Sequence, residues 1–405
     1  MAQAIATQCC VAGGGPAGMM LGFLLARAGI DVTVLEKHAD FLRDFRGDTI
    51  HPSTLELMHE LGLLDAFLKL PHSTAPTLSG RYGNLELTIA DFRHLPTRCK
   101  YIALMPQWDF LNFLADHGRR YPRFNLLMRA EVTDLIEEGG RVRGVRAATP
   151  DGVLEVRAAL VVGCDGRHST VREKAGLIVE ELGAPMDVLW FRVSRLSGDP
   201  EETMGLFLPG RILVMIERGN YWQCAYVIPK GSIEDVRARG IESFRAAVEQ
   251  AVPFLKGRMR EIKDWDQIKL LTVAVDRLKR WHRSGLLCIG DAAHAMSPIG
   301  GVGVNLAVQD AVATANILAE PLRAGPIDDG TLQKVQDRRE FPTRVTQRVQ
   351  VFLQNNVIRT VLGQSELKPP LALRLLQHYP ILRRIPARVL GLGVRPEHIH
   401  TPERI

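Results

Sequence analysis

A glycine-rich turn near the N-terminus constrains the fold of this chain more than any other feature. The apolar run over residues 5–12 has the length of a buried strand, and the string GGGPAG follows it directly. Helix-forming residues continue over 19–28 and stop at Gly29. A β-branched run over 32–35 comes next. The order strand, glycine turn, helix, strand predicts a doubly wound α/β domain.

The spacing of the glycines predicts what this turn binds. The pattern Gly13-x-Gly15-x-x-Gly18 allows a tight turn and a close backbone approach to a pyrophosphate, and the helix N-terminus offers unpaired amides with partial positive charge. Glu36 stands 18 residues after Gly18, where a carboxylate accepts the ribose hydroxyls of an adenosine. The unit therefore predicts a bound NAD or FAD. A structural turn without a ligand is the alternative.

The length of the chain indicates more than one domain. Its 405 residues exceed the roughly 250 to 300 at which a single hydrophobic core stops growing. Residues 182–229 are rich in aromatic and β-branched residues and predict a separate, mostly antiparallel sheet, whereas 331–390 have a helical pattern. We expect a discontinuous nucleotide-binding domain over residues 1–75, 97–180 and 280–325. A sheet domain is expected over 76–96 and 181–279, and a helical region over 326–405.

Shorter patterns refine this outline. Leucine and methionine at three- and four-residue spacing predict a helix over 53–70, and another helix is expected to begin near Gln107. Alternating residues over 125–163 predict strands. A buried strand is expected over 286–289, followed by a turn and a helix that begins near Gly303 to Asn305.

Charge and cysteine content exclude several classes of protein. The formal charge of +6 comes from 51 Lys and Arg against 45 Asp and Glu, with no basic run of five or more, so no nucleic-acid partner is indicated. Six cysteines without a CxxC pair or suitably spaced histidines indicate no metal site and a reducing cytoplasm.

Two segments raise the question of a membrane. Residues 2–26 contain no charged side chain, which on length alone would suit a membrane span. Four successive helix breakers interrupt them, so no membrane span is predicted. The C-terminal part places arginines between leucines, at Arg374, Arg383, Arg384, Arg388 and Arg395. We interpret it as a solvated helix face, with an interfacial lipid contact as the alternative.

Two further glycine–acid motifs follow predicted strands. The string GCDGRHSTVR begins at Gly163 and contains Asp165. The string GDAAHAMSPIGGVGVN begins at Gly290 and contains Asp291. With the three motifs in this order, the chain resembles the class A flavoprotein monooxygenases, the family of para-hydroxybenzoate hydroxylase and the ubiquinone-biosynthesis hydroxylases, over about residues 5–320.

The resemblance implies an α/β fold: a Rossmann-like FAD-binding domain of the GR2 type, a mostly antiparallel substrate sheet and a helical C-terminal region. It implies FAD as the bound cofactor and NADH or NADPH as a transient co-substrate, consistent with the absence of a second strand-GxGxxG-helix unit. The residues that it places near FAD are Gly13, Gly15, Pro16, Ala17, Gly18, Glu36, Lys37, Arg46, Gln107, Val132, Asp165, Asp291, Pro298, Gly301, Val302, Gly303, Val304 and Asn305. For Arg46 and Gln107, a surface ion pair and a helix cap are the alternatives.

The chemistry implied by the resemblance is hydroxylation. NAD(P)H reduces FAD, O2 adds to give a flavin hydroperoxide, and its distal oxygen passes to an electron-rich aromatic or quinone-like small molecule. No catalytic side chain is assigned, because His294 inside the Gly-Asp motif is interpreted as a packing residue. The candidates for lining a substrate cavity are His51, Arg192, Arg211, Tyr221 and Trp222.

Other functions share this pattern. Trp222 begins a string, WQCAYVIP, that superficially resembles the WxWxIP signature of flavin-dependent halogenases, but the second tryptophan is missing. A prenyl-chain reductase and an epoxidase are further enzymatic alternatives. A non-catalytic nucleotide-binding scaffold is the alternative from a different class, and a homodimer is left open.

Overall fold

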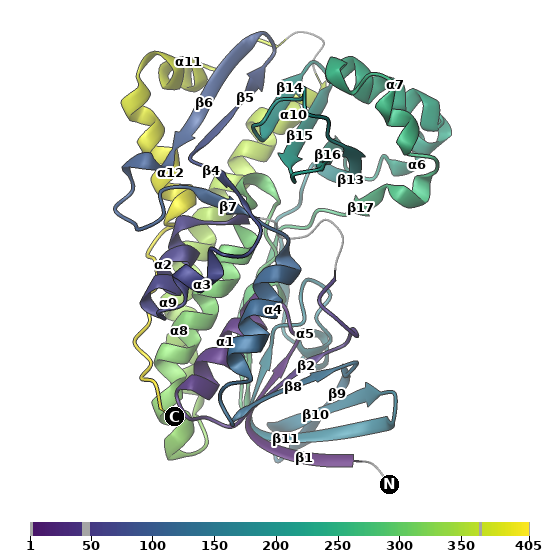
Figure 1. Ribbon diagram of the computed structural model, residues 1–405. Helices are drawn as coiled ribbons and strands as arrows, with labels where there is room; N and C mark the ends of the chain where they lie inside the picture. Colours follow the sequence, from purple (N-terminus) through teal and green to yellow (C-terminus); the bar gives the residue numbers. More distant parts are fainter. Residues whose placement is uncertain (1–2, 43–48, 364–366, 405) are drawn as a thin grey trace.

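The structure, a computed structural model, describes residues 3–42, 49–363 and 367–404 (Figure 1). The strands β1 and β2 and the helix α1 between them form the predicted unit at the N-terminus. Cys9 and Cys10 of β1 are fully buried, and all five residues of β2 are buried too. This burial on both faces explains the continuous apolar runs in the sequence, because a parallel sheet is covered by helices on both sides.

The first sheet is mostly parallel. Strand β1 lies between β11 and β2, β2 also pairs with β8, and β11 pairs with β20. An antiparallel β9–β10 extension joins β11, and β19 closes the other edge. The strands of this sheet are β1 (Gln3–Ala12), β2 (Val32–Glu36), β8 (Phe124–Met128), β9 (Glu131–Glu138), β10 (Arg141–Thr149), β11 (Gly152–Gly163), β19 (His282–Arg283) and β20 (Leu286–Cys288). The carboxyl ends of β1, β2, β11 and β20 therefore meet at one edge.

Helices pack closely on this sheet. Gly22 of α1 approaches β2 so closely that an added Cβ would lie 2.6 Å from a methyl group of Val34. The long helix α8 packs against both α1 and α9 (Figure 1). The helices of this half are α1 (Pro16–Arg27), α4 (Gln107–Gly118), α5 (Thr170–Lys174), α8 (Gly303–Ala324) and α9 (Asp329–Leu353).

The predicted helix over 53–70 is in fact two helices, α2 (Pro52–Glu60) and α3 (Leu64–Phe67). Gly62 between them has φ of +71°, a conformation that ends a helix and that glycine adopts without strain. The apolar spacing continues across the break because Leu55 and Leu64 enter the same core. The expectation of one continuous helix was therefore wrong.

The second sheet has the order β17-β13-β16-β15-β14-β5-β6 and is antiparallel except for the β14–β5 pair. Its strands are β5 (Thr77–Tyr82), β6 (Leu85–Asp91), β13 (Met186–Ser194), β14 (Met204–Leu208), β15 (Arg211–Glu217), β16 (Tyr221–Pro229) and β17 (Lys269–Leu271). Residues 77–91 thus join a sheet formed mainly by 186–229, although the first segment precedes the second by about a hundred positions. The exact domain limits stay a prediction.

The two faces of this sheet pack on different partners. Phe191 and Trp222 lie on the face covered by α6 (Ile233–Ala238) and α7 (Ile241–Ala251). Val188 and Ile212 lie on the opposite face, packed near α10 (Arg359–Gly363). Short strands link the two sheets: β3 (Thr49–Ile50), β4 (Ser73–Ala75) and β7 (Ile102–Leu104) form one sheet, and β12 (Val179–Glu181) pairs with β18 (Asp276–Leu278).

The C-terminal region is helical only in part. Helices α11 (Leu371–His378) and α12 (Arg384–Gly391) lie beside β6 (Figure 1). After α12 the chain runs without helix back to the first domain, where the Arg404 N–H donates to the carbonyl of Arg27 at 2.8 Å. The expectation of helix therefore holds to Gly391 and not beyond.

Within the described part of the chain, one segment has the length and hydropathy of a membrane span, Ile299–Ala324. In its most apolar window 72% of the residues are buried inside the protein. This burial is what a core helix shows, since α8 packs between α1 and α9.

Candidate active site

The turn before α1 depends on two of its glycines. Gly13 has φ of +106°, and a Cβ there would lie 2.4 Å from the carbonyl oxygen of Cys164. A Cβ on Gly18 would lie 1.9 Å from the carbonyl oxygen of Gly13. Both distances are far below van der Waals contact, so the turn excludes any side chain at these two positions.

The remaining glycine of the pattern, Gly15, faces open space. An added Cβ on Gly15 has no heavy atom within 4 Å. Gly15 is the N-cap of α1, no side chain caps the helix, and its first turn has no acidic residue. Pro16 is the first helical residue, and Ala17 is buried behind it. The free amides and the positive end of the helix dipole therefore face a cradle that suits an anionic group.

Glu36 lies at the end of β2 beside this turn. Its side chain is almost fully buried, and its two carboxylate oxygens accept from the N–H groups of Gly14 and His38, both at 3.0 Å. The carboxylate is thereby fixed next to the glycine turn. Lys37 points away, since its exposed ammonium lies 3.9 Å from Glu131, and Val132 is buried in β9.

Asp165 follows β11 and binds the beginning of α5, whose N-cap residue is Ser169. Its carboxylate accepts from Ser169 Oγ at 2.5 Å and from the N–H of Val171 at 3.0 Å. Burial raises the pKa of Asp165, and these hydrogen bonds oppose that rise. Asp165 therefore fixes the loop after β11, which the glycine turn touches through Gly13.

The second and third motifs meet through an ion pair. Arg167, two residues after Asp165, places a guanidinium nitrogen 3.8 Å from Asp291 Oδ2. Gly290 has φ of +60°, and an added Cβ would lie 3.1 Å from the Cβ of Ala17 and 3.3 Å from that of Ala307. The Gly-Asp motif is thus enclosed between the beginnings of α1 and α8. The sequence motif contained Arg167, but only the fold reveals its contact.

The segment before α8 is a second tight turn. Gly300 and Gly301 have φ of +78° and +61°, and Thr49 Oγ1 donates to the Gly301 carbonyl at 2.8 Å. Helix α8 then begins at Gly303 with no side-chain cap and no acidic residue in its first turn. The first amides of α8, from Gly303 and Val304, follow Pro298 and Val302 of the same turn.

Asn305 is used by the protein itself. Its Oδ1 accepts from the His51 N–H at 2.8 Å and from Thr54 Oγ1 at 2.7 Å, and its Nδ2 donates to the Thr49 carbonyl at 3.1 Å. The side chain thereby ties α8 to β3 and α2. Its position near FAD was predicted by resemblance, and these contacts assign the side chain to holding the turn.

His51, a predicted substrate-cavity residue, is fully buried as the N-cap residue of α2. Its Nδ1 lies 2.7 Å from the carbonyl oxygen of Leu390. Burial lowers the pKa of His51 to about 4, against the opposing effect of its hydrogen bond to the Leu390 carbonyl. The imidazole is therefore neutral at neutral pH.

A buried charge network lies behind the Gly-Asp motif. Asp310 of α8 is completely buried, and its carboxylate contacts His294 Nε2 at 2.6 Å, Arg339 Nε at 2.9 Å and the N–H of Gly290 at 3.1 Å. Burial would raise the pKa of Asp310, but His294 and Arg339 outweigh it and lower the pKa. Arg339 also contacts Glu397 at 3.2 Å. His294 therefore has a structural partner, as its interpretation as a packing residue expected.

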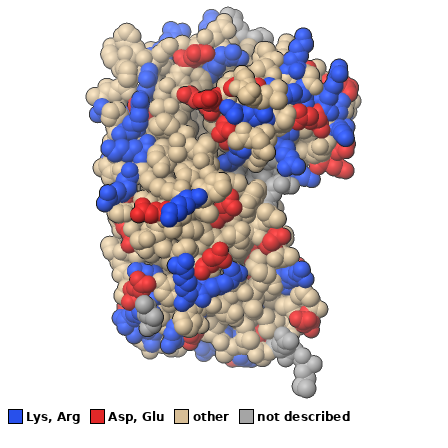
Figure 2. All heavy atoms as spheres, in the orientation of Figure 1, with Lys and Arg blue, Asp and Glu red and all other residues tan. Residues whose placement is uncertain are grey.

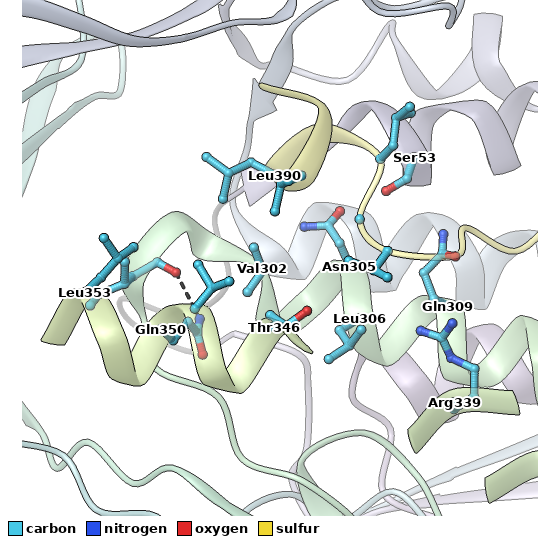
Figure 3. Close-up of a pocket in the computed structure, with 16 residues that line it drawn as sticks. Ser53, Val302, Asn305, Leu306, Gln309, Arg339, Thr346, Gln350, Leu353 and Leu390 are labelled. Atoms are coloured by element: carbon cyan, nitrogen blue, oxygen red, sulfur yellow. Dashed lines mark hydrogen bonds between the residues drawn. The ribbon is translucent and has the colours of Figure 1, made fainter. Parts of the chain in front are cut away.

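A cavity lies beside the first turns of α8 (Figure 3). It is small, with a volume of about 70 Å³, and is partly open to solvent. The side chains of Ser53, Asn305, Gln309 and Arg339 line it together with leucines and valines from α9 and residues 389–394. The cavity reaches the turn at the beginning of α8, and none of its lining residues belongs to the glycine turn.

The other predicted substrate residues fall on two faces of the second sheet. Trp222 is completely buried on the α7 side and its Nε1 donates to Asp199 at 2.9 Å, and Arg211 donates to Gln250 of α7 at 2.7 Å. Because side chains alternate along a strand, Arg192 and Tyr221 belong to the opposite face. The four candidates on the sheet therefore lie on two faces, and which of them line a substrate cavity stays a prediction.

Two predicted cofactor residues remain. Gln107 is the first residue of α4, with Pro106 as N-cap. Arg46 lies outside the described residues. Thr49 and Arg167, which the sequence did not single out, hold the two later motifs in place.

Comparisons with known proteins identify the family. Residues 6–349 match the family model described as an FAD binding domain. The 6-methylpretetramide 4-monooxygenase of Streptomyces rimosus is 33% identical over 398 residues, which cover 96% of this chain and 94% of that protein.

Solved structures share the fold. The p-nitrophenol 4-monooxygenase of Pseudomonas putida DLL-E4 superposes with a TM-score of 0.77 at 22% identity, covering 96% of this chain and 97% of the other. A myxobacterial chondrochloren halogenase superposes with a TM-score of 0.75 at 19% identity, covering 95% and 92%. The fold alone therefore does not separate hydroxylases from halogenases. With its glycine turn, its Gly-Asp motif and a family match over most of its length, the chain belongs to the FAD-binding-domain family.

Proposed function

We propose that this protein is an FAD-dependent monooxygenase of the cytoplasm that hydroxylates an aromatic or quinone-like small molecule with NADH or NADPH and O2. One observation carries the proposal: three motifs meet around the open cradle at Gly15, in a chain similar over almost its whole length to a monooxygenase. That relative is named for its action on 6-methylpretetramide.

The residues present suit FAD. The cradle before α1 would hold the pyrophosphate, and Glu36, already fixed by the N–H of Gly14, would accept the ribose hydroxyls of the adenosine. Asp291 would lie along the ribityl chain and Asp165 would serve both FAD and the nicotinamide cofactor, with Arg46 and Gln107 as further contacts to FAD. When bound, FAD supplies the redox chemistry that activates O2 with electrons from NAD(P)H.

The chain's own contribution is binding and electrostatics. The uncapped N-terminus of α8 would direct the amides of Gly303 and Val304 at the flavin ring, where fixed dipoles stabilise negative charge. Tight packing of Gly301 against Thr49 holds this turn rigid, so the dipoles need no reorganisation. We assign the substrate to the sheet face that carries Arg192 and Tyr221, where a guanidinium suits a phenolate.

Hydroxylation is favoured over halogenation by the place of Trp222. This residue begins the string that superficially resembles a halogenase signature, yet its ring is completely buried against α7 residues and Phe254, and its N–H is bonded to Asp199. It therefore serves the core of the sheet domain. Epoxidation of an alkene stays the enzymatic alternative.

The test begins with the cofactor. We expect purified protein to have a flavin absorption spectrum and heat to release FAD. NAD(P)H oxidation should then accelerate when phenols are added, and label from ¹⁸O2 should appear in the product. A scaffold would show no stimulation by any phenol, and a halogenase would require halide.

A variant pair links this activity to the site. Asp291→Ala should lose FAD and turnover, because it removes the carboxylate that would lie along the ribityl chain and that pairs with Arg167. Asp151→Ala, at an exposed hairpin position, is the matched control and should keep both. Equal FAD content and turnover in the two variants would reject the assignment of Asp291.

A further inference from the structure

The C-terminal helices carry a row of large apolar side chains that face solvent. Leu371, Ile381 and Ile385 have exposed fractions of 72%, 66% and 63%. None of the residues of α11 is buried. We call this surface the C-terminal apolar face, formed by Leu371, Leu375, Tyr379, Ile381, Ile385 and Val389. Single exposed apolar residues are ordinary, but six of them, four on α11 and α12 and two in the short connection between these helices, mark a binding surface.

This face continues onto α9. Phe352, at the end of α9, is 63% exposed, and Val349, one turn before it, is 42% exposed. Val349 and Val389 line the same cavity, so the edge of α9 and the edge of α12 adjoin there. The apolar surface therefore extends over two separate parts of the chain.

The charges carried by this segment of the chain have one sign. From residue 367 to residue 396 the sequence has six basic residues and no acidic one. Figure 2 shows Lys and Arg side chains along the edge occupied by α11 and α12. The basic residues are Lys368, Arg374, Arg383, Arg384, Arg388 and Arg395.

The exposed arginines of this group are available to a partner. Arg374, Arg384 and Arg388 are exposed, and none of them forms an ion pair within residues 3–42, 49–363 and 367–404. Arg383 differs from them, because its guanidinium donates to the carbonyls of Leu376 and Gln377. It therefore links the segment just before α12 to the end of α11. Three guanidinium groups thus flank the apolar row without an acidic partner.

We propose that the C-terminal apolar face docks on an anionic phospholipid surface. Amphipathic helices with exposed apolar residues and flanking cations lie in the plane of a membrane interface, where the apolar side chains enter the headgroup boundary and the cations meet lipid phosphates. A second copy of the chain fits less well. A two-fold interface would place this face against itself and would bring basic residues together with no acidic residue from 367–396 to neutralise them.

The experiment measures binding to vesicles and does not depend on catalysis. The full-length, FAD-loaded protein is mixed with vesicles of phosphatidylcholine alone, or of phosphatidylcholine with phosphatidylglycerol, and bound protein is separated by flotation. We expect binding to the phosphatidylglycerol vesicles, and weaker binding as salt rises, because salt screens exposed charges.

Two variants separate charge from apolar contact. Arg374→Gln, Arg384→Gln and Arg388→Gln together should weaken partitioning by about a hundredfold, at about fivefold for each arginine near the lipid surface. The double variant Ile381→Ser and Ile385→Ser should also weaken it, since both side chains are exposed and their loss removes inserted apolar surface. The matched control, Arg120→Gln with Lys256→Gln and Arg260→Gln, neutralises three exposed cations elsewhere and should bind as the wild type does.

Each other result would overturn the proposal. Absence of flotation with phosphatidylglycerol vesicles would exclude an anionic lipid surface. Equal loss in the triple arginine variant and in its control would show attraction by net charge alone. A concentration-dependent dimer that the Ile381→Ser and Ile385→Ser variant abolishes, without vesicle binding by the wild type, would show that a second copy covers the face.

Discussion

At the scale of single residues, the glycines of the N-terminal turn separate folding from binding. Gly15 has φ of −74°, which alanine adopts without strain, and an added Cβ would enter open space. We predict that Gly15→Ala keeps the melting temperature of the apoprotein and weakens FAD binding about tenfold or more, equivalent to about 1.4 kcal/mol. The methyl group would occupy the approach of the pyrophosphate. Fluorescence titration with FAD measures the effect.

Two control variants separate an effect on FAD binding from an effect on folding. Gly198→Ala also places a Cβ in open space, at an exposed turn far along the chain, and should leave FAD affinity unchanged. Gly18→Ala should impair folding itself, because its Cβ would overlap the carbonyl oxygen of Gly13. An unchanged FAD affinity in Gly15→Ala would remove the pyrophosphate from this turn.

His51 gives the protein a dependence on pH. Its pKa is about 4 in the folded protein because of burial, against an ordinary value of 6.5. As the pH falls below 6.5, His51 is protonated in the unfolded chain but stays neutral in the folded protein. The free energy of unfolding therefore decreases between pH 6.5 and 4, by about 3 kcal/mol in total. Above pH 6.5 this residue contributes no pH dependence.

The variant His51→Asn isolates this effect. Asparagine has no proton to bind in this range and keeps a donor for the Leu390 carbonyl, which His51 Nδ1 now contacts. We expect the difference in unfolding free energy between wild type and variant to shrink from pH 7 to pH 5. A difference that stays constant over this range would contradict the lowered pKa.

At the scale of elements, the Asp310 network joins α8, α9 and the C-terminal segment. Arg339 and Asp310 are 1% and 0% exposed in their side chains. Replacing Arg339 with Met would leave the buried carboxylate of Asp310 without its guanidinium partner, so we predict a loss of about 3 to 5 kcal/mol in urea unfolding. Arg344→Met removes an exposed pair with Glu340 at 3.4 Å and should cost less than about 1 kcal/mol. Similar losses in the two variants would contradict this assignment.

The elements that the sequence predicts correctly are those with a local cause. The strand, glycine turn and helix at the N-terminus follow from residues that are neighbours in the chain, and α4 and α8 begin where predicted. The faces of the second sheet do not follow, because strand alternation fixes which residues share a face but not which face meets the flavin. Arg211 and Trp222 therefore lie on a different face from Arg192 and Tyr221, which the sequence did not reveal.

The Asp310 network escaped prediction for a related reason. Its members come from positions 294, 310, 339 and 397, and no motif links them. Their contacts arise only when α8, α9 and the returning C-terminal segment pack together. Charged side chains are ordinarily exposed, so the sequence gives no signal that Asp310, Arg339 and Glu397 are buried.

At the scale of the whole molecule, the proposed FAD site is built from segments that are distant in the chain. The turn at Gly13 touches the loop at Cys164, and Gly290 packs against Ala17 and Ala307. A ligand that contacts all of these segments stabilises the folded state only, because the unfolded chain does not bring them together. FAD binding should therefore raise the stability of the entire first domain.

We predict a rise of about 2.7 kcal/mol in unfolding free energy when FAD exceeds its dissociation constant a hundredfold. Thermal denaturation of apoprotein with added FAD measures this rise. Riboflavin, which lacks the pyrophosphate and adenosine, should give no shift at the same concentration, because the cradle at Gly15 and the carboxylate of Glu36 would then have no ligand. An equal shift with riboflavin would place the binding energy on the ring alone, and an equal shift with NAD would contradict the preference for FAD that the family match indicates.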